Sequence, residues 1–355
     1  MVRSGAEADT AEDGTGRGGR LPGVTLLTGA TGFIGSGLAR RLAADGWALR
    51  ALVRPTTDAS WLEKLGVEVV RGDLRDLASL DRALQGTTRV FHLAARTSHG
   101  NLPESEMVAI NVVGTENVAS AALRVGVERF VHCSTARVYG IIRNHAVDED
   151  TPFDPDSAYP ESKARAEAIV REHEARGLPL VVARITAVFG PGSKSWLPLF
   201  QSIADGSFRM IGSGGNYHHP ADLDDVVDGL VRCASVPGVE GRAYILTADE
   251  PIRLRDLIAM IADELGTTVS KRPLPGWPLS LYKRAQDVGR AVGVKRLPRF
   301  DRVEFFVNDR IFSIARARAE LGFEPRVGLR ESVRRTADSY RSLGLLPARG
   351  SARTA

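Results

Sequence analysis

The chain has 355 residues, of which 43% are hydrophobic and 25% are charged, and its formal net charge is only +4. This balance is typical of a soluble globular protein and gives no reason to expect a nucleic-acid partner. The two cysteines, Cys133 and Cys233, lie far apart, and no Cys/His cluster has the spacing of a metal site. We therefore expect reduced thiols, no metal and a cytoplasmic location.

Neither end of the chain has the composition of a packed domain. Residues 1–21 are rich in glycine and charge and lack an apolar run, which predicts a disordered tail rather than a signal peptide. Residues 346–355 are predicted to form a second loose tail. Because no segment offers about 18 consecutive apolar residues, we expect no transmembrane helix.

Short apolar runs alternate with helical patterns between residues 22 and 188. The predicted strands are GVTLLTG (23–29), ALRALV (48–53), VEVVRGD (67–73), RVFHLAA (89–95), RFVHCST (129–135) and PLVVARI (179–185). The predicted helices are GSGLARRLAADGW (35–47), SWLEKLG (60–66), LASLDRALQG (77–86), MVAINVVGTENVASAALRVG (107–126) and AYPESKARAEAIVREHEARG (158–177). This alternation predicts an α/β fold, a doubly wound parallel Rossmann sheet with helices on both faces.

The pattern changes after Val188. Segment 189–216 has loop and helix character, and 217–247 holds a helical pattern that could return to the sheet. Another helical pattern, RLRDLIAMIADELG (253–266), follows, and residues 271–302 are rich in proline and arginine. We therefore predict an NAD(P)-binding Rossmann domain from 22–188 and 217–247. A smaller, discontinuous C-terminal substrate domain would comprise 189–216 and 248–345, over the carboxyl ends of the strands.

The first predicted strand runs into the loop TGATGFIG (28–35), where Gly29, Gly32 and Gly35 have GxxGxxG spacing. In such loops one glycine permits a tight turn, one lets the backbone approach a pyrophosphate, and one packs helix against strand. The phosphate then sits at the N-terminus of the next helix. Because this loop joins the first strand to the first helix, it predicts a dinucleotide site; the alternative is a glycine-rich connection without a ligand.

The end of the second strand bears on the choice of dinucleotide. NAD-binding proteins place an acidic residue there to bond the ribose hydroxyls, whereas this chain has Val53 followed by Arg54. No carboxylate repels a 2′-phosphate, and a guanidinium is available to bind one. The residues favour NADP(H), with NAD(H) as the alternative. Asp73, after the third strand, could bond the adenine amine or cap a helix.

The stretch SAYPESKARAE (157–167) places Tyr159 four residues before Lys163, a spacing at which two side chains share one face of a helix. Only six of the 47 basic residues are lysines, and of the six tyrosines only Tyr159 has a lysine four positions later. The pair is therefore a candidate catalytic unit, although an ordinary surface helix could also carry it.

Seven motifs in this order resemble those of the extended short-chain dehydrogenases/reductases, including the NAD-dependent epimerase/dehydratase and 3β-hydroxysteroid-dehydrogenase-like groups. They are TGATGFIG (28–35), GDL (72–74), HLAA (92–95), NVVGT (111–115), STARVYG (134–140), YPESK (159–163) and RITAVFGPG (184–192). Each motif alone is weak, but their joint order and spacing are specific to this family, and the resemblance covers roughly residues 23 to 345.

The resemblance implies a catalytic triad of Thr135, Tyr159 and Lys163. Tyr159 would exchange a proton with an alcohol or ketone during hydride transfer, Lys163 would lower the pKa of the tyrosine, and Thr135 would orient the substrate oxygen. Asn111 would support this network, or would simply bond a neighbouring loop. The cofactor contacts that the resemblance implies are Gly29, Thr31, Gly32, Phe33, Ile34, Gly35, Arg54, Asp73, Leu74, Leu93, Ala94, Ala95, Asn111, Tyr159, Lys163 and Ile185.

Departures from the patterns of subfamilies narrow the reaction. Sugar 4,6-dehydratases of this family carry an Asp-Glu pair directly after the catalytic threonine, where this chain has Ala136 and Arg137, so a dehydratase is disfavoured. We favour an NAD(P)-dependent oxidoreductase acting on a secondary alcohol or ketone of a sugar nucleotide or a hydrophobic cyclic substrate. The alternatives are an NAD-dependent nucleotide-sugar epimerase and, in another class, a non-catalytic dinucleotide-binding regulator.

The sequence gives fewer indications of the substrate and partners. Arg137, Tyr217 and His218 are candidate contacts for a small-molecule substrate, although the last two could instead pack on the sheet. The segment 271–302 holds nine basic and two acidic residues, a net charge of +7. It could be a lid that binds a nucleotide diphosphate, a basic patch in peripheral contact with a membrane, or a solvated surface. The sequence also leaves a homodimer open.

Overall fold

The computed structural model describes residues 23–97, 103–142, 145–270, 272–291, 305–306 and 308–349. Outside these ranges lie the predicted N-terminal tail, residues 350–355 of the predicted C-terminal tail, and residues 271 and 292–302 of the predicted basic segment. Within the described ranges, no helix is both long and apolar enough to cross a bilayer.

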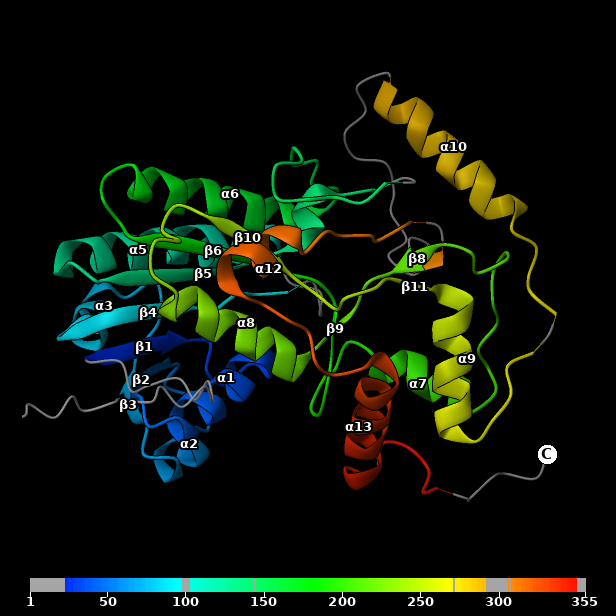
Figure 1. Cartoon of the computed structure of the whole chain (residues 1–355), viewed down its shortest axis with the longest axis horizontal. Helices are drawn as coiled ribbons and strands as arrows, with labels where there is room; N and C mark the ends of the chain where they lie inside the picture. The colour runs from blue at the N-terminus through cyan, green and yellow to red at the C-terminus, as the bar shows by residue number, and fades with distance from the viewer. Residues whose placement is uncertain are drawn as a thin grey trace, which may run out of the picture.

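A seven-stranded parallel sheet forms the centre of the protein (Figure 1). Its strand order is β10-β6-β5-β4-β1-β2-β3, so the chain starts inside the sheet and winds outward in both directions. This order confirms the predicted doubly wound Rossmann fold. The strands are β1 (Val24–Thr28), β2 (Ala48–Val53), β3 (Glu68–Arg71), β4 (Thr87–His92), β5 (Arg129–Thr135), β6 (Leu180–Ile185) and β10 (Ala243–Leu246).

Helices cover both faces of the sheet because successive residues of a strand point to opposite faces. Leu26 of β1 belongs to the core under α3 (Leu77–Leu84), α5 (Gly114–Val125) and α6 (Ala158–Glu174). Its neighbour Leu27 belongs to the core under α1 (Phe33–Ala44), α2 (Ser60–Lys64) and α8 (Leu223–Ser235). Both cores consist of aliphatic and aromatic side chains that are almost completely removed from water, which is the main source of their stability.

The helix predicted over 107–126 begins earlier and is not regular. Helix α4 (Glu104–Val108) continues into a π-helical segment, η1 (Ala109–Val113), and then into α5. A π-helical turn admits one more residue than an α-helical turn, and such turns are frequent at functional sites. Asn111 lies at the middle of η1, and its side chain is buried.

Outside the two cores on the faces of the sheet, a further core lies beside the carboxyl ends of the strands (Figure 1). We call it the second core, because it is separate from the Rossmann sheet. Its centre is a stack of Phe189 on Trp196, with ring centroids 4.1 Å apart. The helices outside the sheet layers are α7 (Leu197–Ala204), α9 (Leu254–Leu265), α10 (Trp277–Ala291) and α13 (Leu329–Ser342). Helix α12 (Ala315–Leu321) instead packs beside β10 and α8, in the core of the sheet. The short strands are β7 (Val188–Phe189), β8 (Tyr217–His218), β9 (Ala221–Asp222) and β11 (Ile252–Arg253).

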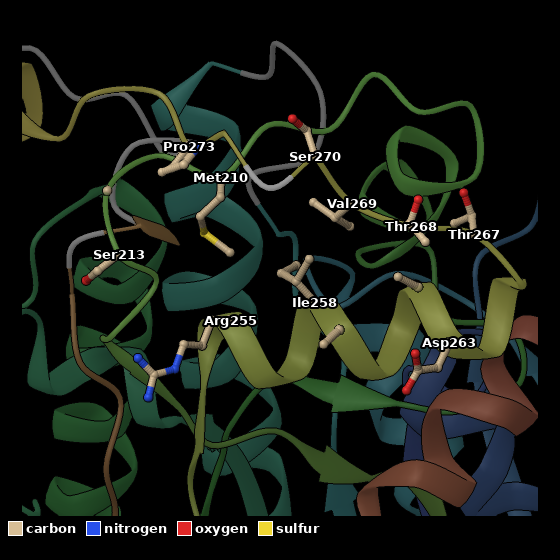
Figure 2. A pocket seen from close by; sticks show the side chains of 13 residues that line it. Met210, Ser213, Arg255, Ile258, Asp263, Thr267, Thr268, Val269, Ser270 and Pro273 are labelled. Atoms are coloured by element: carbon tan, nitrogen blue, oxygen red, sulfur yellow. The ribbon is translucent and has the colours of Figure 1, made fainter. Parts of the chain in front are cut away.

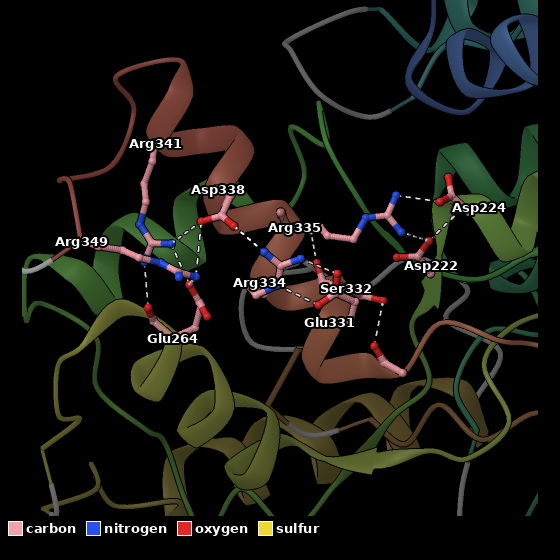
Figure 3. Close-up of polar contacts among 12 residues, drawn as sticks. Asp222, Asp224, Glu264, Glu331, Ser332, Arg334, Arg335, Asp338, Arg341 and Arg349 are labelled. Carbon is pink, nitrogen blue, oxygen red and sulfur yellow. Dashed lines mark hydrogen bonds and ion pairs between the residues drawn. The ribbon is translucent and has the colours of Figure 1, made fainter.

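Helix α13 joins the start of α8 to the end of α9 (Figure 3). Arg335 bonds Asp224 at 2.7 Å and contacts Asp222 at 3.5 Å. One turn and a half later, Arg341 donates to the carboxylate of Glu264 and to its backbone carbonyl, both at 2.7 Å. A rigid guanidinium can satisfy two acceptors at once, so α13 holds the second core against the Rossmann sheet.

A buried ion pair connects strand β6 to helix α6. Arg184 donates to Glu167 at 2.6 Å, to the hydroxyl of Tyr139 at 2.6 Å and to the carbonyl of Glu149 at 2.7 Å. Both charged side chains are almost completely buried. Arg184 therefore fixes α6, η2 (Ala136–Tyr139) and the segment around Glu149 relative to one another.

Substituting Glu167→Ala should destabilise the fold by about 3–5 kcal/mol, because the guanidinium of Arg184 would stay buried without its counter-charge. Urea denaturation measures this change. As a matched control, Asp81→Ala removes the partner of Arg124 from an ion pair that is exposed on both sides, and should change the midpoint little. Equal midpoints for the two variants would contradict the structural role of the buried pair.

Candidate active site

The loop between β1 and α1 forms a close-packed turn with room for a ligand in front of it. Gly29 has φ +79°, and a Cβ there would lie 2.6 Å from the amide nitrogen of Ala94. A Cβ on Gly35 would lie 2.1 Å from the carbonyl oxygen of Gly29. Gly32 is the N-cap of α1, and the first turn of this helix has neither a side-chain cap nor an acidic residue. Its N–H groups are therefore suited to an anion, as a dinucleotide pyrophosphate requires.

The other predicted cofactor residues lie at the carboxyl ends of neighbouring strands. The amides of Leu93 and Ala94, which directly follow β4, donate to the carbonyl and hydroxyl oxygens of Thr28 at 3.2 and 3.3 Å. Arg54 directly follows β2 and is exposed, and Ile185 ends β6. The carboxyl ends of parallel strands meet at one edge of a sheet, so these positions lie along the same edge as the glycine loop, where a dinucleotide would bind.

Asp73 is not a helix cap. The N-cap of α3 is Asp76, whose carboxylate accepts from the amide of Ala78 at 3.1 Å. Asp73 instead binds the side chain of Arg75 at 2.8 and 3.0 Å, and this hydrogen bond, together with the nearby charge of Arg54, lowers the pKa of its carboxyl. Contact of Asp73 with the adenine stays a prediction.

The three predicted catalytic residues come from β5 and α6. Thr135 ends β5, and its hydroxyl donates to the carbonyl of Ile185 at 3.4 Å. Tyr159 lies in the first turn of α6, and Lys163 lies one turn further on. Burial raises the pKa of Tyr159 to about 12, and the guanidinium of Arg137 acts in the opposite direction.

Arg137 has a second role that sequence reasoning missed. Its backbone amide donates to the hydroxyl of Thr135 at 3.3 Å, and its guanidinium lies 3.5 Å from the hydroxyl of Ser157, just before α6. From this position its charge favours the phenolate of Tyr159. The sequence assigned this effect to the ammonium of Lys163.

Lys163 is buried, and its Nζ points to His132, with 3.5 Å between Nζ and Nε2. Burial lowers the pKa of Lys163, and it lowers the pKa of His132 well below the usual value. A neutral imidazole can accept a hydrogen bond from an ammonium. His132 was not among the predicted site residues, although its place two residues before Ser134 on β5 is readable in the sequence.

A hydrogen-bond chain joins the glycine loop to the helix of Tyr159. The imidazole of His92 lies 2.8 Å from the hydroxyl of Thr28 and 2.9 Å from that of Thr115. Because the hydroxyl of Thr115 donates to the carbonyl of Asn111, it must accept from Nε2–H of His92, which leaves Nδ1 to accept from Thr28. Burial lowers the pKa of His92 to about 3, so this neutral tautomer persists at physiological pH.

Asn111 completes this chain. Its side-chain amide donates to Ser162 at 2.9 Å, and Ser162 donates to the backbone carbonyl of Tyr159 at 2.7 Å. The side-chain oxygen Oδ1 of Asn111 accepts from the backbone amide of Arg96 at 2.7 Å. Asn111 is therefore a buried support of the first turn of α6 and of the segment after β4.

The candidate substrate residues on β8 differ in exposure. His218 is buried against Phe305, with ring centroids 4.5 Å apart. The Nε2 atom of His218 bonds the backbone carbonyl of Phe305 at 2.9 Å. Burial lowers the pKa of His218 to about 3, as expected for a core histidine. Tyr217 is only half-buried, with the guanidinium of Arg253 5.2 Å from its ring centroid. This packing favours Tyr217 over His218 as a direct substrate contact.

A cavity of about 390 Å³, open to solvent, lies at the edge of the second core, between α9 and the segment that leads to α10 (Figure 2). Its walls include Met210, Arg255, Ile258, Val269 and Pro273. None of the predicted catalytic or cofactor residues lines it. The cavity is therefore separate from the surroundings of Tyr159.

Comparisons with known proteins agree with this geometry. Residues 25–246 match the model of the NAD dependent epimerase/dehydratase family. The chain is 30% identical over 313 residues to the 4-hydroxy-2-methyl-3-oxo-4-farnesyl-3,4-dihydroquinoline-1-oxide ketoreductase of Stigmatella aurantiaca, with 85% of this chain and 92% of the relative covered. It is 31% identical to sterol demethylase protein B of Methylococcus capsulatus, over 85% of this chain and 94% of that protein.

A solved structure shows the same fold. The UDP-glucuronic acid 4-epimerase of Bacillus cereus, in complex with NAD, superposes with a TM-score of 0.72 at 22% identity and covers 90% of this chain and 99% of its own. At this identity the similarity is one of fold.

Gly32→Ala should preserve the fold and weaken dinucleotide binding by at least about tenfold, because the new methyl group would fill the approach to the N-terminus of α1. A Cβ there would meet only the carbonyl oxygen of Gly29, at 3.2 Å. The measurement is NADPH fluorescence titration together with a thermal melt.

The matched control is Gly328→Ala, at the N-cap of α13, where a Cβ would have no neighbour within 4 Å. This control should bind the dinucleotide as the unmodified chain does. Undiminished binding by Gly32→Ala would contradict the placement of the phosphate.

Proposed function

Because the chain belongs to the NAD-dependent epimerase/dehydratase family, of the extended short-chain dehydrogenase/reductase type, we propose that it is an NADP(H)-dependent reductase of a hydrophobic cyclic ketone, with Tyr159 as the proton donor. The observation that carries this proposal is the contact of Arg137 with the hydroxyl of Thr135 at the end of β5 and with Ser157 just before Tyr159, which brings these residues together. A regulator that only binds a dinucleotide has no need of such proton-transfer groups.

The proposed reaction assigns one task to each side chain. A bound nicotinamide supplies or accepts the hydride. The phenol of Tyr159 donates its proton to the oxygen of the ketone as the alcohol forms, and the hydroxyl of Thr135 orients that oxygen. The ammonium of Lys163, which lies 3.5 Å from Nε2 of His132, would bind the nicotinamide ribose.

The raised pKa of Tyr159 suits the reductive direction. With a pKa of about 12, the side chain carries its proton throughout the physiological range and is ready to donate it. Oxidation of the alcohol would need the phenolate, so its rate should rise as the pH increases towards this pKa. The cation of Arg137 limits the rise of the pKa and keeps the reverse reaction accessible.

The class of substrate is supported by the names of two relatives. One reduces a ketone in a farnesyl-bearing quinoline oxide, and the other is named for sterol demethylation; both names point to large hydrophobic rings. The epimerase alternative is supported by a relative of 31% identity that is named a 4-epimerase and by fold similarity to an epimerase whose structure contains NAD. No residue of this chain distinguishes an epimerase from a reductase. A sugar dehydratase is disfavoured by Ala136 and Arg137.

The preference for NADP(H) is supported by the exposed Arg54. This residue directly follows β2, and Arg71 on β3 donates to its backbone carbonyl at 3.4 Å. Two guanidinium groups therefore lie at the edge where the adenosine ribose would sit, and such groups match the geometry of a 2′-phosphate.

Reduction of a panel of cyclic ketones with NADPH tests the function. Tyr159→Phe should lower kcat by about 10²–10⁴-fold and leave NADPH binding intact, because only the transferable proton is lost. Tyr244→Phe is the matched control, since Tyr244 lies on the outer strand β10 and its hydroxyl bonds Glu320 of α12. Stoichiometric NAD recovered from the denatured protein would favour the epimerase, and NADPH binding without reduction of any ketone would favour the regulator.

Arg54→Ala should raise the KM for NADPH by about tenfold or more and leave the KM for NADH nearly unchanged, because only NADPH carries the 2′-phosphate that the guanidinium would bind. Steady-state kinetics with both cofactors measure the ratio. The control Arg124→Ala removes an exposed guanidinium from α5 and should change neither value. If both KM values change equally for Arg54→Ala, the proposed cofactor preference is wrong.

A further inference from the structure

Helix α10 presents large apolar side chains to solvent. It stands apart from the sheet layers at the edge of the molecule (Figure 1). Trp277 is 68% exposed, Leu281 62% and Val288 59%, and Leu274, just before the helix, is 47% exposed. Single exposed apolar residues are common in soluble proteins, but several on one short element indicate an interaction surface.

The exposed residues form a continuous stripe on α10. Leu281 follows Trp277 by four positions, and Val288 follows Leu281 by seven, so all three lie on one face of the helix. Ala285, four positions after Leu281, is also exposed and extends the same face. We call this face the apolar stripe of α10.

The charge of this region identifies the partner. The sequence of α10 contains Lys283, Arg284 and Arg290 against the single acid Asp287. The whole segment 271–302 carries +7, compared with +4 for the complete chain, so the rest of the protein is net acidic. A basic helix with an exposed apolar stripe matches an anionic lipid surface, and a tryptophan at one end suits the interface between headgroups and acyl chains.

A second copy of the chain is a poorer match for this surface. Pairing two apolar stripes would bring two basic α10 helices together, each with three basic residues and one acidic residue, and their repulsion would oppose the contact. An anionic bilayer removes the same apolar area from water and adds attraction in place of repulsion.

We propose that α10 docks the enzyme on the surface of an anionic membrane through its apolar stripe. The inference deepens the proposed function, because a hydrophobic ketone would be concentrated in a bilayer. The base of α10 also borders the second core: Leu274 exchanges backbone hydrogen bonds with Met210 and Gly212, at 2.7 and 3.0 Å, and both residues line the cavity of Figure 2. The segment that leads into α10 is therefore held directly beside this cavity.

Co-sedimentation with lipid vesicles tests the proposal on the full chain. We expect at least about tenfold stronger binding to vesicles of phosphatidylglycerol and phosphatidylcholine than to phosphatidylcholine alone, with weaker binding at high salt. The variant Trp277→Ser/Leu281→Ser/Val288→Ser should lose this binding and should reduce a water-soluble ketone as well as the unmodified chain. The single variant Trp277→Ser should show an intermediate loss, which guards against a folding defect in the triple variant.

A matched control carries the same kind of change elsewhere. Leu65→Ser/Val125→Ser/Leu343→Ser replaces three other exposed apolar residues and should retain vesicle binding. Equal binding by the stripe and control variants would overturn the proposal, as would an unmodified chain that ignores anionic vesicles. So would light scattering that shows a dimer dissociating when the stripe is replaced, or binding to an acidic peptide but not to vesicles.

The proposed membrane contact and the proposed reaction can be tested independently of each other. Binding requires neither the cofactor nor Tyr159, so the Tyr159→Phe variant should sediment with vesicles as the unmodified chain does. Binding without reduction of any ketone would reject the proposed reaction and keep the membrane contact. Reduction without binding would reject only the contact.

Discussion

The arrangement around Tyr159 depends on one buried hydrogen-bond chain, in which His92 is the central member. Its two nitrogens bond Thr28 at the end of β1 and Thr115 in α5, so one neutral tautomer satisfies a strand and a helix at once. Buried polar groups are costly when unpaired, and each member of such a network therefore fixes its neighbours. Through Asn111 and Ser162 the same chain reaches the backbone of Tyr159. The cofactor loop and the candidate catalytic helix thus share one support.

Many contacts between separate helices and strands of this protein are made by arginine side chains. The chain has only six lysines among its 47 basic residues, and the arginines repeatedly bond two or three acceptors from different elements. Arg184 joins β6, α6 and η2, and Arg341 joins α13 to α9. A planar, permanently charged fork can do this where a flexible ammonium cannot. Lys163 is an exception that suits its proposed task, because an ammonium can approach a ribose hydroxyl as a compact donor.

The two cores divide the proposed functions between them. The Rossmann sheet supplies the glycine loop, Thr135 and the first turn of α6, which are positioned by rigid strands and short connections. The second core supplies the half-buried Tyr217, the cavity beside α9 and the projecting helix α10.

The sequence by itself determined the features that have a local period or a fixed spacing. Alternating strands and helices gave the doubly wound sheet, GxxGxxG gave the close turn between β1 and α1, and four-residue spacing placed Tyr159 and Lys163 on one helix. Tertiary structure alone decided which distant side chains meet. It directed Lys163 to His132, brought the charge of Arg137 to bear on Tyr159, and buried His218 against Phe305. It also gave the cap of α3 to Asp76 rather than Asp73. Such contacts depend on strand register and packing between segments far apart in the chain, and no local pattern records them.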